Sequence, residues 1–300
     1  MKDLDINFPL EKFENLIIDI GWESLDDWFN FWNNQKNILS IEKYWNNKVN
    51  DDWIWGLALP LLSQAYKFHN NFSNRKIIGI SALPGTGKTT LGKWLEEISL
   101  KLNFKIAVIS IDDFYLPSEE MKLAIKENPW NVSRGFPGSH SVKLMHEKLL
   151  NWKINGELIV PVYDKSLRNG LGDRSHWRSD NPDLLILEGW FLGVKPLPRD
   201  TSSSYQYSNS ADLSLYESSY ISRIQENLTK YSDVWSLLDK IWHLKPLKFE
   251  YMNMWKLNQE KEMFLKRGNA LKDEKLSNFL RMLNVSIPHK SFDDIYSYAL

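Results

Sequence analysis

The chain has 300 residues, enough for one large domain or two modest ones whose core needs no disulfide or metal. Its 37 basic and 38 acidic residues give a formal net charge of -1, which argues against binding nucleic acid or anionic membranes through surplus positive charge. Hydrophobic residues make up 43% and charged residues 25%, so we expect a folded chain, and the lack of cysteine excludes disulfides, thiol catalysis and cysteine-bound zinc.

The N-terminus alternates in charge and carries no apolar segment of the kind found in secretory signals. The longest apolar stretch, residues 53–62, is far shorter than the about 20 residues that a membrane-spanning helix needs. The sequence therefore predicts a cytoplasmic protein with no membrane partner, and it leaves the oligomeric state open.

Residues 1–75 predict a helical, Trp-rich N-terminal extension packed on the core. In residues 23–34 and 53–68, apolar side chains recur at the i, i+3, i+4 spacing of amphipathic helices. Few residues here carry chemistry, so we expect packing to be their main role, with a partner-binding surface as the alternative.

From residue 76 onward, short apolar runs alternate with helical segments, which predicts an α/β fold: a mostly parallel sheet flanked by helices, with a helical C-terminal region. Residues 76–300 are expected to form this second domain, in which the Ser-, Tyr- and Asn-rich residues 200–220 are interpreted as a mobile insertion. The expected strands are 77–81, 105–111, 158–162, 184–187 and 241–244. The expected helices are 88–103, 142–152, 249–266 and 273–283.

The first strand of this domain runs into a phosphate-binding loop, the P-loop, which places the fold in the P-loop NTPase type. Gly85 and Gly87 let the backbone curl so that its N–H groups face phosphate oxygens, and the following helix adds the positive end of its dipole. Lys88 then reaches the β- and γ-phosphates, and the Thr89 hydroxyl can bind Mg²⁺. The residues expected to contact ATP are Ala82, Pro84, Gly85, Thr86, Gly87, Lys88, Thr89 and Thr90. A Gly-rich turn that carries Lys-Thr by chance is the alternative, and Ala82 stands where the pattern has its first glycine.

Acidic residues follow two of the expected strands. Asp112 and Asp113 close the strand 105–111, and Glu188 closes the strand 184–187. Because the carboxyl ends of parallel strands line the ligand site, Asp112 can orient or deprotonate an acceptor hydroxyl, and Glu188 can hold Mg²⁺ directly or through water. The alternative is a structural role, and Asp113 fits a simple helix cap.

Five motifs together resemble the D-glycerate 3-kinase family, which lies among the P-loop small-molecule kinases that include uridine and pantothenate kinases. They are SIDDFYL at 110–116, RGFPGSH at 134–140, PVYDKS at 161–166, GDR at 172–174 and EGW at 188–190. The resemblance runs from about residue 75 to the end, and it implies that Asp112 acts as catalytic base or metal anchor. Besides Ala82, Ser141 departs from the pattern, because the family has Asp there. We expect Ser141 to cap the helix 142–152.

The middle motifs also suit a small anionic acceptor. Glycerate offers a carboxylate and two hydroxyls, and arginine can bind a carboxylate through two hydrogen bonds. The candidate substrate-binding residues are Arg134, His140, Tyr163, Lys165 and Arg174, on segments that glycines make into loops. Each cation has a surface charge or an ion pair as its alternative role.

The sequence as a whole predicts ATP-dependent phosphorylation of the 3-hydroxyl of D-glycerate. Lys88, Asp112 and Glu188 are the expected catalytic residues, and Thr89, Asp112 and Glu188 are the expected Mg²⁺ ligands. Two alternatives stay open at this point: a kinase for another hydroxyl substrate such as a nucleoside or pantothenate, and a non-catalytic ATP-binding switch. Lys256, in a segment similar to the helix that packs beside the nucleotide in this family, is a further candidate phosphate contact, with a place on a solvated helix face as the alternative.

Overall fold

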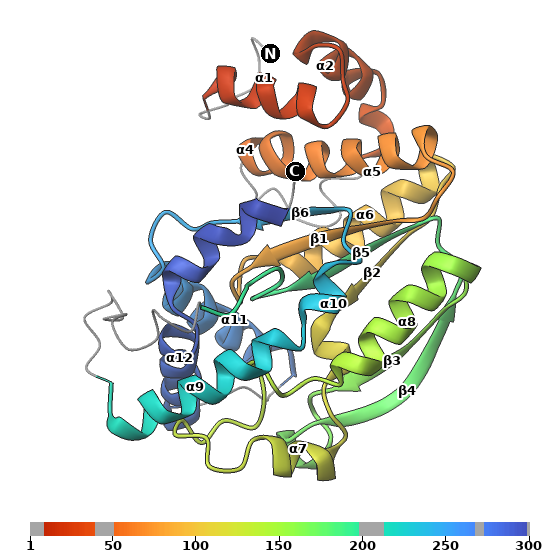
Figure 1. Cartoon of the computed structure of the whole chain (residues 1–300). Helices are drawn as coiled ribbons and strands as arrows, with labels where there is room; N and C mark the ends of the chain where they lie inside the picture. The colour runs from red at the N-terminus through yellow and green to blue at the C-terminus, as the bar shows by residue number, and fades with distance from the viewer. Residues whose placement is uncertain (1–8, 40–50, 198–212, 268–272, 299–300) are drawn as a thin grey trace. The chain divides into compact units, whose positions relative to one another are not determined.

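The computed structural model in Figure 1 describes residues 9–39, 51–197, 213–267 and 273–298. The chain divides into two compact units. The first consists of Met1–Lys76, Gly87–Val108 and Pro182–Ile186. The second consists of Ile77–Thr86, Ile109–Asn181 and Leu187–Leu300. The first unit thus contains more than the expected N-terminal extension 1–75, and a domain boundary at residue 75 stays a prediction.

Helices make up most of the first unit. They are α1 (Leu10–Asp19), α2 (Leu25–Asn34), η1 (Lys36–Ile38), α4 (Asp51–Trp53), η2 (Ile54–Ala58), α5 (Leu59–Asn71) and α6 (Lys88–Lys101). The helical spacing of residues 23–34 and 53–68 is confirmed, although the second segment opens through one wider π-helical turn, η2. Ser24 caps α2 by accepting a hydrogen bond from the Asp27 N–H, which explains why this helix begins at Leu25.

Two buried tryptophans of the first unit share one polar anchor. Trp28 and Trp32 each donate an indole N–H to the Ser63 hydroxyl oxygen over 2.7 Å, and that hydroxyl donates to the Leu59 carbonyl over 2.7 Å. All three side chains are buried, so every polar group in this cluster is satisfied within the protein. Packing is therefore the role that the structure gives to these tryptophans.

We expect Ser63→Ala to lower the free energy of unfolding by about 2–4 kcal/mol, because it leaves two buried indole N–H groups without an acceptor. Urea unfolding followed by tryptophan fluorescence measures the change. Ser236→Ala is the matched control, since the Ser236 hydroxyl is exposed and donates only to the Asp233 carbonyl. A Ser63→Ala protein as stable as the control would contradict this interpretation.

The α/β fold expected from the sequence is confirmed. The main sheet has four strands in the order β2-β5-β1-β6, and it is mostly parallel and flanked by helices. The strands are β1 (Lys76–Ala82), β2 (Ile106–Ser110), β5 (Leu184–Gly189) and β6 (Lys240–Leu244). Strands β1 and β6 are parallel, with Ile78 opposite Lys240 and Ala82 opposite Leu244. Residues 77–82 and 184–187 are buried throughout, as a sheet covered on both faces requires.

The expected strand 158–162 does not belong to the main sheet. It forms β3 (Leu158–Asp164), which pairs antiparallel with β4 (Asp173–Asp180) as a separate two-stranded ribbon. The sequence analysis also missed β4, because its polar residues lack an apolar run and its strand conformation depends on pairing with β3. The glycines that suggested a loop, Gly170 and Gly172, form the turn between the two strands, each with positive φ.

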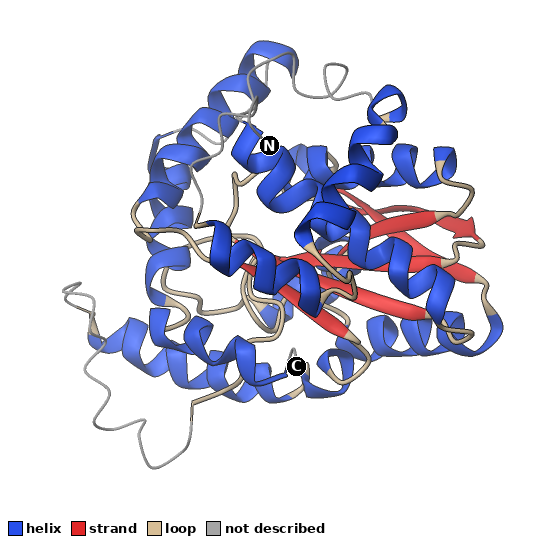
Figure 2. Ribbon diagram, turned by 90° about the horizontal axis from the view of Figure 1, so that it is seen from above, coloured by secondary structure: helices blue, strands red, loops and turns tan. Residues whose placement is uncertain are grey.

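The remaining helices of the described residues belong to the second unit (Figure 2). They are η3 (Ile111–Phe114), α7 (Ser118–Ala124), α8 (Val142–Asn155), η4 (Arg168–Gly170), α9 (Leu215–Thr229), α10 (Ser232–Trp235), α11 (Tyr251–Arg267), α12 (Asp273–Val285) and η6 (His289–Tyr298). The helices expected at 142–152, 249–266 and 273–283 are confirmed as α8, α11 and α12. Among the described residues, no helix has the length and apolarity needed to cross a membrane.

The stretch expected as an insertion, 200–220, begins among residues 198–212, which lie outside the described part, and ends inside helix α9. Ser214 and Glu217 form a reciprocal cap that starts this helix. Glu217 also accepts hydrogen bonds from Trp130 over 2.9 Å and from Arg281 of α12 over 2.8 Å. The Arg281 hydrogen bonds lower the pKa of Glu217 to about 2, so this buried carboxylate stays charged and joins α9 to α12.

Candidate active site

The phosphate loop has the backbone geometry that the sequence predicts. Gly85 and Gly87 both have φ of 85°, a left-handed conformation that favours glycine, and Gly87 caps α6. The Thr86 hydroxyl donates to the Leu83 carbonyl over 2.9 Å and closes the turn. Ala82 is the last residue of β1 and is buried in the strand, so this position needs no glycine. The loop is thus compatible with alanine in place of its first glycine.

Gly85 also lies directly against helix α11. A Cβ atom on Gly85 would come within 2.8 Å of the Trp255 Cβ and 2.9 Å of the Trp255 carbonyl carbon. Because one of these atoms is backbone, a side chain at position 85 would push the helix and the loop apart. Lys256, the next residue of the helix, forms an ion pair with Glu260 over 2.6 Å.

We expect Gly85→Ala to reduce ATP affinity by at least about tenfold, because the new methyl group meets α11 and alanine resists the φ of the loop. Isothermal titration calorimetry with ATP measures this effect. Gly156→Ala is the matched control, since Gly156 has φ of 84° at the C-terminal cap of α8 and lies outside the phosphate loop. Equal ATP affinities in the two variants would contradict the expected role of Gly85 in the phosphate loop.

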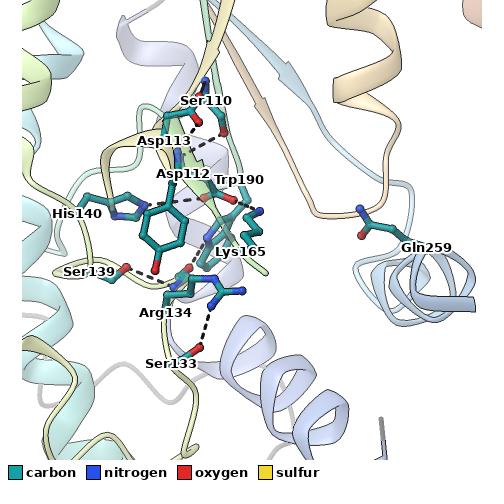
Figure 3. Close-up of polar contacts among 12 residues, drawn as sticks. Ser110, Asp112, Asp113, Ser133, Arg134, Ser139, His140, Lys165, Trp190 and Gln259 are labelled. Atoms are coloured by element: carbon teal, nitrogen blue, oxygen red, sulfur yellow. Dashed lines mark hydrogen bonds and ion pairs between the residues drawn. The ribbon is translucent and has the colours of Figure 1, made fainter. Parts of the chain in front are cut away.

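Asp112 lies in η3, just beyond the end of β2. Its Oδ2 is 2.7 Å from the Lys165 Nζ, and its Oδ1 is 3.9 Å from the His140 Nε2 (Figure 3). Burial raises the pKa of Asp112, but the Lys165 ammonium and the neighbouring His140 act more strongly together and hold the pKa well below its usual range. Asp112 is therefore a carboxylate that stays ionised although it is half-buried.

Asp113 has the structural role that the sequence left as its alternative. Its carboxylate accepts hydrogen bonds from the Ser110 N–H over 3.2 Å and from the Tyr163 N–H over 3.4 Å. The Ser110 hydroxyl in turn accepts a hydrogen bond from the Asp112 N–H, and the two side chains together form a reciprocal cap at the start of η3. Asp113 thereby fixes the end of β3 beside η3 and brings Lys165 within reach of Asp112.

Lys165 follows the last residue of β3. The Asp112 carboxylate raises the pKa of Lys165, and Glu188 at the end of β5 acts in the same direction. Of the predicted site residues, Asp112 and Glu188 therefore both interact electrostatically with Lys165.

Arg134 and Tyr163 meet at the turn of the ribbon. The Arg134 Nη1 donates to the Leu171 carbonyl over 2.8 Å and to the Gly170 carbonyl over 3.1 Å, and the guanidinium lies 5.8 Å from the centre of the Tyr163 ring. The Tyr163 hydroxyl donates to the same Leu171 carbonyl over 3.2 Å. Burial raises the pKa of Tyr163, so its hydroxyl stays protonated at neutral pH.

Arg174 is held by protein groups. Its Nη2 donates to the Ser141 hydroxyl over 2.7 Å, and its Nε donates to the Tyr115 carbonyl over 3.2 Å. Ser141 is the N-cap residue of α8 as expected, but its hydroxyl accepts from Arg174 and makes no cap hydrogen bond. Arg174 thus joins β4 to the segments before and after the 134–140 motif.

His140 is buried, and its ring stacks on Tyr115 with centroids 4.5 Å apart. Burial lowers the pKa of His140, which favours the neutral imidazole at physiological pH. The loop before it is tightly held, because the Ser139 hydroxyl donates to the Phe136 carbonyl and the Trp190 indole donates to the Gly135 carbonyl, both over 2.6 Å. Sequence reasoning assigned no role to Tyr115, Ser139 or Trp190, although all three lie in the motifs.

Oxygen ligands suited to Mg²⁺ are present in the second unit at the carboxylates of Asp112 and Glu188. Within the described residues, no group of three or more acidic or histidine side chains is arranged to hold a metal ion. A Mg²⁺ ion that arrives with nucleotide phosphates needs only one or two protein carboxylates, since phosphates and water fill its other positions. The donor set therefore fits a nucleotide-borne ion.

Comparisons with known proteins relate the chain to kinases, although no family model matches it. The kinase mug58 of Schizosaccharomyces pombe is 31% identical over 216 residues, which cover 68% of this chain and 76% of that protein. The chloroplastic D-glycerate 3-kinase of Arabidopsis thaliana is 33% identical over 217 residues, which cover 68% of this chain and 45% of that protein. A solved D-glycerate 3-kinase of Cryptococcus neoformans matches with a TM-score of 0.64 and 27% identity, covering 80% of this chain and 87% of that chain.

Proposed function

Because the chain belongs to the D-glycerate 3-kinase family of P-loop small-molecule kinases, we propose that it phosphorylates the 3-hydroxyl of D-glycerate with ATP. The products are 3-phosphoglycerate and ADP. ATP is the phosphoryl donor that a kinase of this family implies, and the acceptor is a small molecule. The contact between Asp112 and Lys165 is the observation that carries the proposal, because it provides an ionised carboxylate beside a cation.

Asp112 and Lys165 have different roles toward the acceptor. Asp112 accepts a hydrogen bond from the primary hydroxyl of glycerate and takes its proton as the oxygen attacks the γ-phosphorus. The bond from that phosphorus to the bridging oxygen breaks, and the electron pair leaves with ADP. Lys165 and Arg134 supply positive charge for the glycerate carboxylate, and Tyr163 and His140 complete the proposed acceptor site. Arg174 belongs to this set through the segments that it holds in place.

On the nucleotide side, the amides of the phosphate loop and Lys88 hold the phosphates. Thr89, Asp112 and Glu188 are the residues that would hold Mg²⁺, which supplies charge neutralisation for the phosphates. Phosphoryl transfer passes through a loose transition state, so positioning and charge should contribute more to the rate than the base does.

The proposed acceptor is tested by ADP release with D-glycerate, L-glycerate, uridine and pantothenate in one coupled assay. We expect turnover with D-glycerate and at least about a hundredfold less with uridine or pantothenate. Uridine has no carboxylate, and the carboxylate of pantothenate lies much farther from its hydroxyl groups than that of glycerate. Higher turnover with uridine or pantothenate would contradict the proposal and indicate a kinase for another hydroxyl substrate. ATP binding without turnover of any acceptor would favour a non-catalytic switch.

Asp112→Asn should lower kcat by about 10²–10⁴-fold, because the amide cannot take the proton and no longer attracts Lys165. Affinity for ATP, measured by titration calorimetry, should change little. Asp26→Asn is the matched control, since Asp26 is exposed in the first turn of α2 and lies outside every motif; it should leave kcat unchanged. An Asp112→Asn enzyme with wild-type kcat would refute the assignment of Asp112.

A further inference from the structure

Tyr231 lies between helices α9 and α10 and is fully buried, outside every motif noted in the sequence. Its ring stacks on Trp235, with centroids 5.4 Å apart, and meets Phe191 edge-on at 5.2 Å. Aromatic packing therefore fixes the position of the ring, and the hydroxyl makes contacts of its own.

The hydroxyl oxygen of Tyr231 has two kinds of neighbour. The Gly138 N–H donates to it over 3.1 Å, and the His140 Nδ1 lies 2.8 Å away. Burial raises the pKa of Tyr231, so the phenol is protonated, and the backbone N–H groups of Gly138 and His140 both act in the opposite direction. The oxygen thus accepts hydrogen bonds from the backbone, and its one hydrogen has the His140 Nδ1 as its acceptor.

An Nδ1 that accepts a hydrogen bond carries no hydrogen of its own, so a neutral imidazole must carry it on Nε2. The His140 Nε2 is buried and has no hydrogen-bond partner among the described residues. It faces the Asp112 Oδ1 at 3.9 Å, too far for a hydrogen bond but close enough for the N–H dipole to attract the carboxylate (Figure 3).

We propose that Tyr231 is a positioning residue, which fixes His140 in the tautomer whose Nε2–H faces Asp112 and so holds this carboxylate for the acceptor hydroxyl. The chain of contacts runs from the Gly138 N–H through the Tyr231 hydroxyl and His140 to Asp112. The catalytic consequence rests on the proposed function, whereas the tautomer itself depends only on the fold.

The test is the tautomer of His140 in the full-length protein. Two-bond ¹H–¹⁵N NMR spectra of histidine-labelled protein distinguish a protonated ring nitrogen from an unprotonated one, and the His140 signals are those lost in His140→Gln. In the wild type we expect an unprotonated Nδ1 and a protonated Nε2. In Tyr231→Phe we expect averaged shifts from both tautomers, and a kcat about tenfold lower with an unchanged KM for ATP.

Tyr220→Phe is the matched control, because Tyr220 is a buried tyrosine of α9 that packs on Trp130 and Phe136. It should leave both the tautomer and kcat as in the wild type. An Nδ1–H tautomer or an imidazolium in the wild type would overturn the proposal. A Tyr231→Phe protein whose His140 shifts and kcat equal those of the wild type would also overturn it. If no acceptor is phosphorylated at all, the proposed function fails, and the spectra still decide the tautomer.

Discussion

The ion pair between Asp112 and Lys165 is the interaction on which the candidate site depends. A half-buried carboxylate is costly unless a partner compensates for its lost hydration, and Lys165 provides that compensation over 2.7 Å. The pair forms only because β3 ends beside η3, and Asp113 fixes this junction through the Tyr163 N–H. Two adjacent acids therefore have different contacts: Asp113 holds the ribbon in place, and Asp112 forms the ion pair with Lys165.

Buried polar groups also find partners among the aromatic residues, which make up 13% of the chain. Several buried indole N–H groups donate to specific acceptors, as Trp94 does to the Leu39 carbonyl and Trp235 to the Val194 carbonyl. Trp130 and Trp190 do so beside the 134–140 motif, at Glu217 and at the Gly135 carbonyl. In these tryptophans, the hydrogen bond of the indole N–H defines the orientation in which the ring packs.

The phosphate loop shows how a local motif and a distant element constrain one residue together. Glycine at position 85 is needed for the backbone curl, which the motif itself implies, and also for the close approach of Trp255 in α11, which is 170 positions along the chain. Ala82 illustrates the opposite case, since the strand conformation of this residue removes the need for glycine that the motif suggests.

The sequence by itself determined the α/β class, the phosphate loop, most helices and the strands of the main sheet, because periodicity, glycine and capping signals act over a few residues. The tertiary structure alone decided that β3 pairs with the polar strand β4, that the Ser141 hydroxyl accepts from Arg174, and that Tyr231 contacts His140. Each of these depends on contacts between residues 9 to 91 positions apart, such as Asp164 with Asp173 and His140 with Tyr231. Local patterns carry no information on such pairs, since only packing brings them together and settles which donor meets which acceptor.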